Sequence, residues 1–208
     1  MKELTEQQVE LITQSVQDAE ERTSAEIVVV IQPRSGSYRD IDLYFATAVS
    51  FMAMCYIVFN PWTVHDARFL PLQFTVVFAL ACALSYFTPV VRRCLTANAR
   101  RMNQVREAAA VWFMREGVSE TKSRSGLLVY ISQLEQRVEV MADTGVIDAV
   151  DADQWNELIS NLQPHAQVSD LAKGAAACVE QIGKTLSPCL PIGADDVNEL
   201  ADRPRVHV

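Results

Sequence analysis

Two long apolar stretches dominate the pattern of hydrophobic and polar positions along this chain. One runs over residues 43–59 and the other over 69–91, and neither contains a charged residue. At about 17 and about 23 residues, both approach or exceed the length that a helix needs to cross a bilayer. Two buried core helices are the alternative, but core helices of this length rarely lack a charged face. We therefore expect a transmembrane helical hairpin over residues 41–91.

The segment before the hairpin follows first a helical and then a strand pattern. Apolar residues recur at helical spacing over residues 5–22, and Thr5 with Gln8 can form a capping box at the start. The β-branched run from Ala25 to Ile31 is typical of a central strand that is covered on both faces. After the hairpin, helical spacing returns and ends at Gly117, a residue suited to a left-handed cap.

The second half of the chain predicts two strands followed by two helices. Leu127 to Ile131 forms a buried run, and Arg137 to Met141 alternates as a half-exposed hairpin partner does. Asp151, with Gln154, and Ser169 are suitable N-terminal caps for the two closing helices.

This order of elements predicts a small α/β/α sandwich with a mixed sheet. Its first two strands should be parallel, and the crossover between them should contain the transmembrane hairpin. Residues 1–34 and 92–190 then form one α/β domain, and residues 191–208 form a flexible tail.

The distribution of charge predicts an orientation in the membrane. Six arginines flank the two spans, whereas the connecting loop from Asn60 to Arg68 has only one. The positive-inside rule then places both termini and the soluble domain in the cytoplasm, with the chain integral to the inner membrane. The net charge of −8 argues against nucleic acid as a partner. The expected partners are the lipid bilayer and another membrane protein.

Four aspartates gather between the predicted strand hairpin and the next helix: Asp143, Asp148, Asp151 and Asp153. Hard cations such as Ca²⁺ or Mg²⁺ prefer oxygen ligands from a flexible loop of this kind, although the spacing is not that of an EF-hand. The alternative is that Asp151 and Asp153 serve the start of a helix and that the other two are solvated turn residues.

The polar loop from Ser119 to Gly126 is a second candidate site. Its hydroxyl groups, together with Lys122 and Arg124, have the composition of a site for a phosphate-like anion. A solvated connector is the alternative. The chain has three histidines, two of which, His65 and His207, lie in the outer loop and next to the last residue. A Ser-His-Asp or Cys-His catalytic arrangement is therefore not expected.

Two segments carry a resemblance to a known family: ERTSAEIVVV at 21–30 and SETKSRSGLLVYISQLEQRVEVMADTGV at 119–146. They resemble the TPM domain, named after a thylakoid lumen phosphatase, a photosystem II repair protein and a receptor modulator. The resemblance extends over about residues 5–188 with the hairpin omitted, and it implies an α/β/α sandwich with a membrane-associated role. Some members of the family are reported as acid phosphatases, some bind divalent cations, and others assist membrane complexes.

One position departs from the family pattern. Many members have Asp or Asn just before the glycine that starts the second strand, whereas this chain has Arg124 and Ser125. Asp143 does match the acidic position of the family in the turn after the hairpin. The departure weakens the case for a phosphatase or a metal site.

Two functions from different classes follow. The first is a non-enzymatic module, held at the cytoplasmic face of the membrane, that assists or scaffolds another membrane protein. The alternative is a divalent-metal-dependent phosphatase that acts at the membrane surface. The sequence favours the first because it offers no convincing nucleophile.

Overall fold

The structure, a computed structural model, describes residues 4–60, 67–168, 170–193 and 198–206. The chain divides into two compact units. The sheet domain comprises Met1–Ser35 and Met102–Val208, and the hairpin unit comprises Gly36–Arg101.

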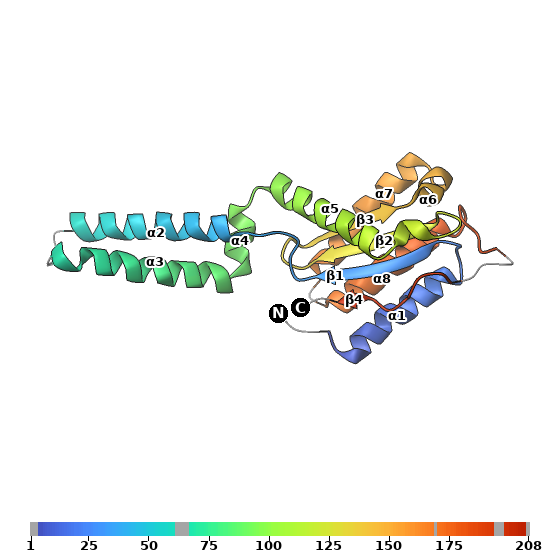
Figure 1. Ribbon diagram of the computed structural model, residues 1–208, viewed down its shortest axis with the longest axis horizontal. Coiled ribbons are helices and arrows are strands. Elements are labelled where there is room, and N and C mark those ends of the chain that lie inside the picture. Colours follow the sequence, from blue (N-terminus) through green and yellow to red (C-terminus); the bar gives the residue numbers. More distant parts are fainter. Residues whose placement is uncertain (1–3, 61–66, 169, 194–197, 207–208) are drawn as a thin grey trace. The chain divides into compact units, whose positions relative to one another are not determined.

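The sheet domain is built on a four-stranded mixed sheet in the order β3-β2-β1-β4 (Figure 1). As expected, β1 (Glu26–Gln32) pairs in parallel with β2 (Gly126–Ser132). Strand β3 (Arg137–Ala142) is antiparallel to β2. The predicted mixed sheet is therefore confirmed. Strand β4 (Arg205–Val206), which pairs in parallel with β1, lies in the segment that the sequence assigned to a flexible tail.

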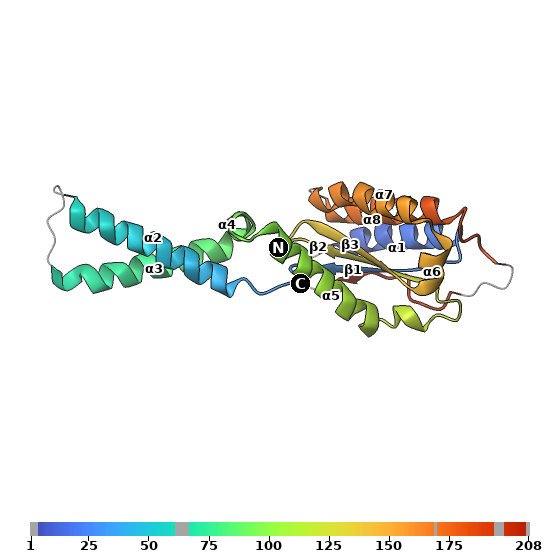
Figure 2. The ribbon, with the colours of Figure 1, turned by 90° about the horizontal axis from the view of Figure 1, so that it is seen from above.

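Helices cover both faces of this sheet. On one face lie α1 (Glu6–Glu20), α7 (Ala152–Leu162) and α8 (Leu171–Leu186); α5 (Asn98–Arg115) covers the other face (Figure 2). Because successive side chains of a strand point to opposite faces, a strand covered on both sides is apolar throughout. Strands β1 and β2 are apolar between their end residues, and all seven residues of β2 and the first six of β1 are buried.

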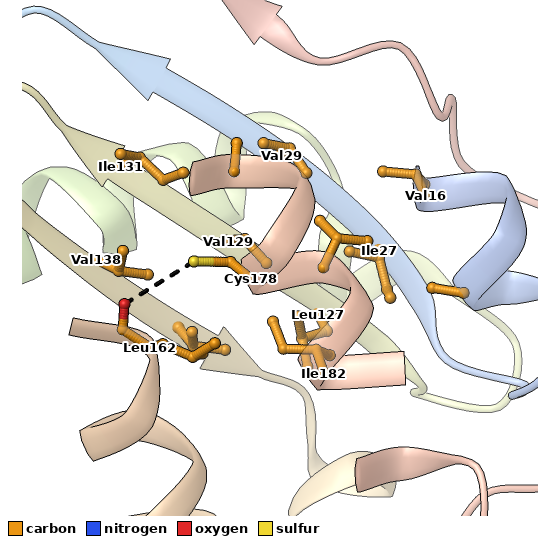
Figure 3. Packing of buried hydrophobic residues seen from close by; sticks show 14 of the residues in the cluster. Val16, Ile27, Val29, Leu127, Val129, Ile131, Val138, Leu162, Cys178 and Ile182 are labelled. Atoms are coloured by element: carbon orange, nitrogen blue, oxygen red, sulfur yellow. Dashed lines mark hydrogen bonds between the residues drawn. The ribbon is translucent and has the colours of Figure 1, made fainter. Parts of the chain in front are cut away.

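The larger core lies between the sheet and helices α1 and α8 (Figure 3). In it, Ile27 and Val129 of the strands pack with Val16 of α1 and Ile182 of α8. Cys178 of α8 is completely buried in this core, with its Sγ atom 3.9 Å from the carbonyl oxygen of Leu162. Burial raises the pKa of the Cys178 thiol to about 12, so it stays protonated at neutral pH.

Several of the predicted helix ends are confirmed. Thr5 and Gln8 form both hydrogen bonds of the capping box at the start of α1. Gly117 adopts the left-handed conformation (φ 65°) just beyond α5, where the short 3₁₀ helix η2 (Val118–Glu120) begins. Asp151 caps α7 by accepting a hydrogen bond from the Asp153 amide. Helix α8 is capped by Asp170, and the expected cap Ser169 lies outside the described residues.

Two further elements complete the sheet domain. Helix α6 (Thr144–Ala149) follows β3 directly, where the sequence indicated only a turn. A 3₁₀ helix, η3 (Gln163–Gln167), extends the chain beyond α7 and contains Pro164 in its first turn. Because proline lacks an amide donor, the α-helical bonding of α7 ends there.

The hairpin unit consists of α2 (Arg39–Phe59) and α3 (Leu70–Phe87), which pack against each other, followed by α4 (Pro89–Leu95) (Figure 1). Before α3 stands the 3₁₀ helix η1 (Ala67–Phe69), and residues 61–66 of the loop lie outside the described residues. Helices α2 and α3 are each long and apolar enough to cross a membrane, and only 11% of each apolar window is buried within the structure. The two expected apolar helices are therefore present.

The second of these helices ends earlier than its apolar run predicted. The run extends to residue 91, but α3 ends at Phe87, and Pro89 starts the separate helix α4. Thr88 between them is extended (φ −114°, ψ 91°), because a residue before proline is disfavoured in the helical region.

Candidate functional site

Asp143 stands where strand β3 passes into helix α6. It is the N-cap of α6, and its Oδ1 atom accepts a 2.7 Å hydrogen bond from the Thr144 amide. Its side chain is only 5% exposed. A carboxylate this well buried requires a compensating charge.

Arg124 provides that charge. It lies two residues before the start of β2. Its Nε atom is 3.0 Å from Oδ2 of Asp143. Arg124 has a positive φ of 57°, a conformation that is uncommon for a residue other than glycine. Arg124, which departs from the family pattern, is therefore the ion-pair partner of Asp143, which matches that pattern.

Backbone contacts hold the Arg124 loop against the Asp143 turn. The Asp143 amide donates to the Gly126 carbonyl at 2.9 Å, and the Gly145 amide donates to the Arg124 carbonyl at 3.0 Å. A Cβ atom at Gly145 would lie 2.6 Å from the Ser123 carbonyl oxygen, and one at Gly126 would lie 1.9 Å from that of Val118. Only glycine allows such a close approach of backbones at these two positions.

The four predicted metal ligands are not gathered into one cluster. Asp143 and Asp151 cap α6 and α7 respectively, whereas Asp148 and Asp153 have exposed side chains. Within the described part of the chain, no group of three or more His, Cys, Asp or Glu residues has an arrangement that could hold a metal ion. Asp151 has the capping role that the alternative gave it. Asp143, which the alternative treated as a solvated turn residue, is instead a buried cap. The metal site stays a prediction.

The two predicted anion-binding residues already have contacts within the chain. The Lys122 amide donates a 3.2 Å hydrogen bond to the carboxylate of Glu199, and the guanidinium of Arg124 pairs with Asp143. Both contacts are made to carboxylates of the chain itself. The side chain of Lys122 is exposed. Binding of an external anion at this loop stays a prediction.

A second polar cluster, which the sequence analysis did not identify, lies at the carboxyl ends of β1 and β2. The Ser35 hydroxyl is 2.9 Å from the Ser132 hydroxyl and 3.0 Å from that of Tyr130. Ser132 donates a short hydrogen bond to Glu135, whose carboxylate also accepts from the Ser35 amide at 3.1 Å. Tyr130, Ser132 and Glu135 are each at least 98% buried.

This second cluster holds the chain in place where it leaves β1. Burial raises the pKa of Tyr130 to about 12, so its hydroxyl keeps its proton and bonds Ser35. Open α/β sheets bind ligands at the carboxyl ends of parallel strands, but here Ser35 and Glu135 bond each other across that end. The signal in the sequence was two polar residues, Ser132 and Glu135, that follow the apolar run from Leu127 to Ile131.

The protein has a mixed sheet with helices on both faces, and an apolar helical hairpin interrupts the chain after the first strand. These features define its class as a three-layer α/β domain with an inserted hairpin. The sequence model of the TPM domain matches residues 91–185. Over these residues the chain thus resembles the TPM-domain family.

One solved structure supports the assignment of the fold. The NMR structure of the BA42 protein from the psychrophilic bacterium Bizionia argentinensis aligns with a TM-score of 0.60 and 17% sequence identity. The alignment covers 99% of this chain and 97% of that one. At this identity the similarity bears on the fold alone. No curated protein matches the sequence significantly.

Proposed function

We propose that this protein is a membrane-anchored TPM module that assists or scaffolds another membrane protein at the cytoplasmic face. The observation that carries the proposal is the place of the hairpin unit in the chain. It is inserted between β1 and α5, so the sheet domain is connected to it by two chain segments. A domain that is tethered twice to a membrane hairpin has little freedom to leave the surface, as suits an accessory module.

The state of the candidate reactive groups supports the same proposal. The Asp143 carboxylate is paired with Arg124, the Cys178 thiol stays protonated, and the Ser132 hydroxyl is bonded to Glu135. A nucleophile needs an adjacent base or a lowered pKa. The Cys178 thiol has neither, and the Ser132 hydroxyl, although it donates to a carboxylate, is completely buried, as is nearly all of the Asp143 side chain. All three groups are therefore poorly accessible to a substrate.

The arginines at one end of the hairpin unit support the proposed orientation in the membrane. Arg92 and Arg100, which follow the spans, form ion pairs with Asp42 and Asp40 of α2, and Arg93 lies between them on α4. The arginine-rich end of the hairpin therefore belongs on the cytoplasmic side by the positive-inside rule.

The test is cross-linked affinity capture of the full chain from membranes that are solubilised in mild detergent. We expect one membrane protein in stoichiometric amount with the bait. The matched control is a variant in which a Gly/Ser linker replaces Gly36–Arg101, which should recover much less of that protein because it is not held at the membrane. Capture of no membrane protein by the full chain would contradict the scaffolding role.

The alternative, a divalent-metal-dependent phosphatase, is tested on the same purified protein. The assay measures hydrolysis of p-nitrophenyl phosphate with Mg²⁺, with Ca²⁺ and with EDTA. We expect that the unmodified protein and Asp143→Asn do not differ in hydrolysis of this substrate. Metal-dependent turnover that this substitution abolishes would replace the scaffold proposal with the enzymatic one.

A further inference from the structure

The hairpin unit has an open groove at the end that carries the first turn of α2 and the last turn of α3. Its volume is about 420 Å³, within the range of small-molecule sites. Six residues line it: Arg39, Asp42, Leu43, Cys82, Ala83 and Tyr86.

Within this groove the charge of Asp42 is already neutralised. Arg92 binds its carboxylate with two hydrogen bonds, Nε to Oδ1 at 2.9 Å and Nη2 to Oδ2 at 2.6 Å. The Ser85 hydroxyl adds a third bond to Oδ1 at 2.7 Å. Such bidentate pairing satisfies both oxygens of the carboxylate. Asp42 consequently presents little negative charge to an anion in the groove.

Arg39 is the cation of the groove that has no partner. Its side chain is exposed, and among the described residues it forms neither an ion pair nor a side-chain hydrogen bond. The neighbouring Asp40 is bound by Arg100, with Nη2 to Oδ1 at 3.0 Å. The polar end of the groove therefore carries a net positive charge.

The rest of the groove is apolar. Leu43 of α2 is 53% exposed, Ala83 of α3 is exposed, and Cys82 beside it is half-buried. Tyr86 is 63% exposed and lies in the last turn of α3, at a level where aromatic side chains meet lipid headgroups. The groove thus matches an amphiphile that has an anionic head and an apolar tail.

We propose that this groove binds one anionic phospholipid, with its phosphate-containing headgroup on Arg39 and an acyl chain along Leu43, Cys82 and Ala83. The proposal rests on the membrane insertion that is proposed above. Charge complementarity favours lipid over a spanning helix of a partner, because acidic residues are rare within such helices. The cytoplasmic leaflet is rich in anionic lipid.

The test is native mass spectrometry of the full chain, purified in mild detergent and mixed with equal amounts of phosphatidylglycerol and phosphatidylcholine. We expect one phosphatidylglycerol adduct to predominate. Arg39→Gln should lower the preference for phosphatidylglycerol about fivefold, in line with about 1 kcal/mol for one arginine at an anionic surface. Ala83→Phe, which fills the apolar part, should reduce binding of that adduct while leaving all charges in place.

Two control variants make the same kinds of change outside the groove. Arg34→Gln also removes an exposed arginine, and Ala48→Phe also adds a ring to an exposed site on a hairpin helix; neither should change the adduct. Equal occupancy by the two lipids, an unchanged preference in Arg39→Gln, or displacement of lipid by a second copy of the chain would overturn the proposal. An alkaline wash of membranes distinguishes failure of this site from failure of the membrane anchor. If the protein is retained in the membranes but shows no lipid preference, only the lipid site is rejected. If the wash releases the protein, the anchor is rejected as well.

Discussion

At the scale of single residues, the Arg124–Asp143 pair determines how the turn before α6 can respond to cations. The side chain of Asp143 is buried, and its Oδ2 atom faces Arg124 Nε at 3.0 Å. A divalent cation that used this oxygen would therefore have to displace a positively charged group. The carbonyl oxygens of Ser123 and Arg124 lie close to Gly145 in the same turn. We therefore expect that Arg124 would compete with a metal ion for the Asp143 carboxylate.

We predict that Arg124→Asn makes the thermal stability depend on divalent cations. Asparagine tolerates the positive φ of this position and brings no positive charge. Millimolar Ca²⁺ should then raise the melting temperature of the variant in detergent by several degrees, and should change that of the unmodified protein by less than about one degree. Adding Asp143→Asn to the variant should abolish the response. An equal Ca²⁺ shift in the unmodified protein would mean that Arg124 does not compete.

A pH dependence follows from Glu139 on β3, which pairs across the sheet with Tyr130. Burial raises the pKa of Glu139, while Arg106 and Arg137 act in the opposite direction. The folded state therefore holds this proton to a higher pH than the unfolded chain, and folding loses stability as the pH rises through that interval. Glu139→Gln should be more stable than the unmodified protein at pH 7.5 and equal to it below the ordinary pKa of glutamate. Urea unfolding at a series of pH values measures this, and a less stable variant at pH 7.5 would contradict it.

At the level of single residues, the sequence could predict only features that depend on near neighbours in the chain. Thr5 with Gln8, Gly117 and Asp151 act at the ends of their own helices, so the residue type and its neighbours were sufficient. The Arg124–Asp143 pair joins a loop to a turn that is 19 positions away along the chain. The bond between Ser35 and Glu135 spans a separation of 100 positions. Such contacts depend on strand register, which no local pattern contains.

At the scale of elements, the short strand β4 is the feature that hydrophobic pattern did not reveal. Within the described part of the C-terminal segment, β4 consists of Arg205 and Val206, and a strand of two residues has no measurable alternation. A long-range ion pair accompanies the strand: Arg205 Nε lies 2.8 Å from the carboxylate of Glu116, just after α5. The segment therefore covers the edge of β1, which would otherwise present unpaired backbone groups.

Deletion of residues 203–208 should expose this edge. We expect faster amide hydrogen exchange in the peptide that contains β1, because Val30 and Ile31 lose their pairing partners. Exchange in β3, which lies at the opposite edge of the sheet, should change much less and serves as the internal control. Unchanged exchange in β1 would show that β4 does not protect the edge.

At the scale of the whole molecule, the hairpin unit is an insertion in a sheet domain that has its own core. The two core clusters consist entirely of residues of the sheet domain. Apolar length predicted the two helices of the hairpin unit because that signal is continuous and local. The limits of the unit, Gly36 and Arg101, lie beyond the apolar runs, and the Asp40–Arg100 ion pair joins the two flanking segments.

If the sheet domain is independent of the insertion, replacing Gly36–Arg101 by a short Gly/Ser linker should leave it soluble and cooperatively folded. Both core clusters are retained in this variant. A single urea transition, seen at the same denaturant concentration by far-ultraviolet circular dichroism and by tryptophan fluorescence, would support this expectation. Aggregation under all solution conditions would indicate that the hairpin contributes to the core.

The central claim is a cytoplasmic TPM domain anchored by a transmembrane hairpin, and a topology measurement tests it most directly. A reporter that fluoresces only in the cytoplasm is fused to either terminus or inserted at His65 in the loop between the apolar helices. We predict fluorescence from both terminal fusions and none from the insertion, with all three proteins retained in membranes after an alkaline wash. Fluorescence from the His65 insertion, or release of the terminal fusions by the wash, would contradict the account.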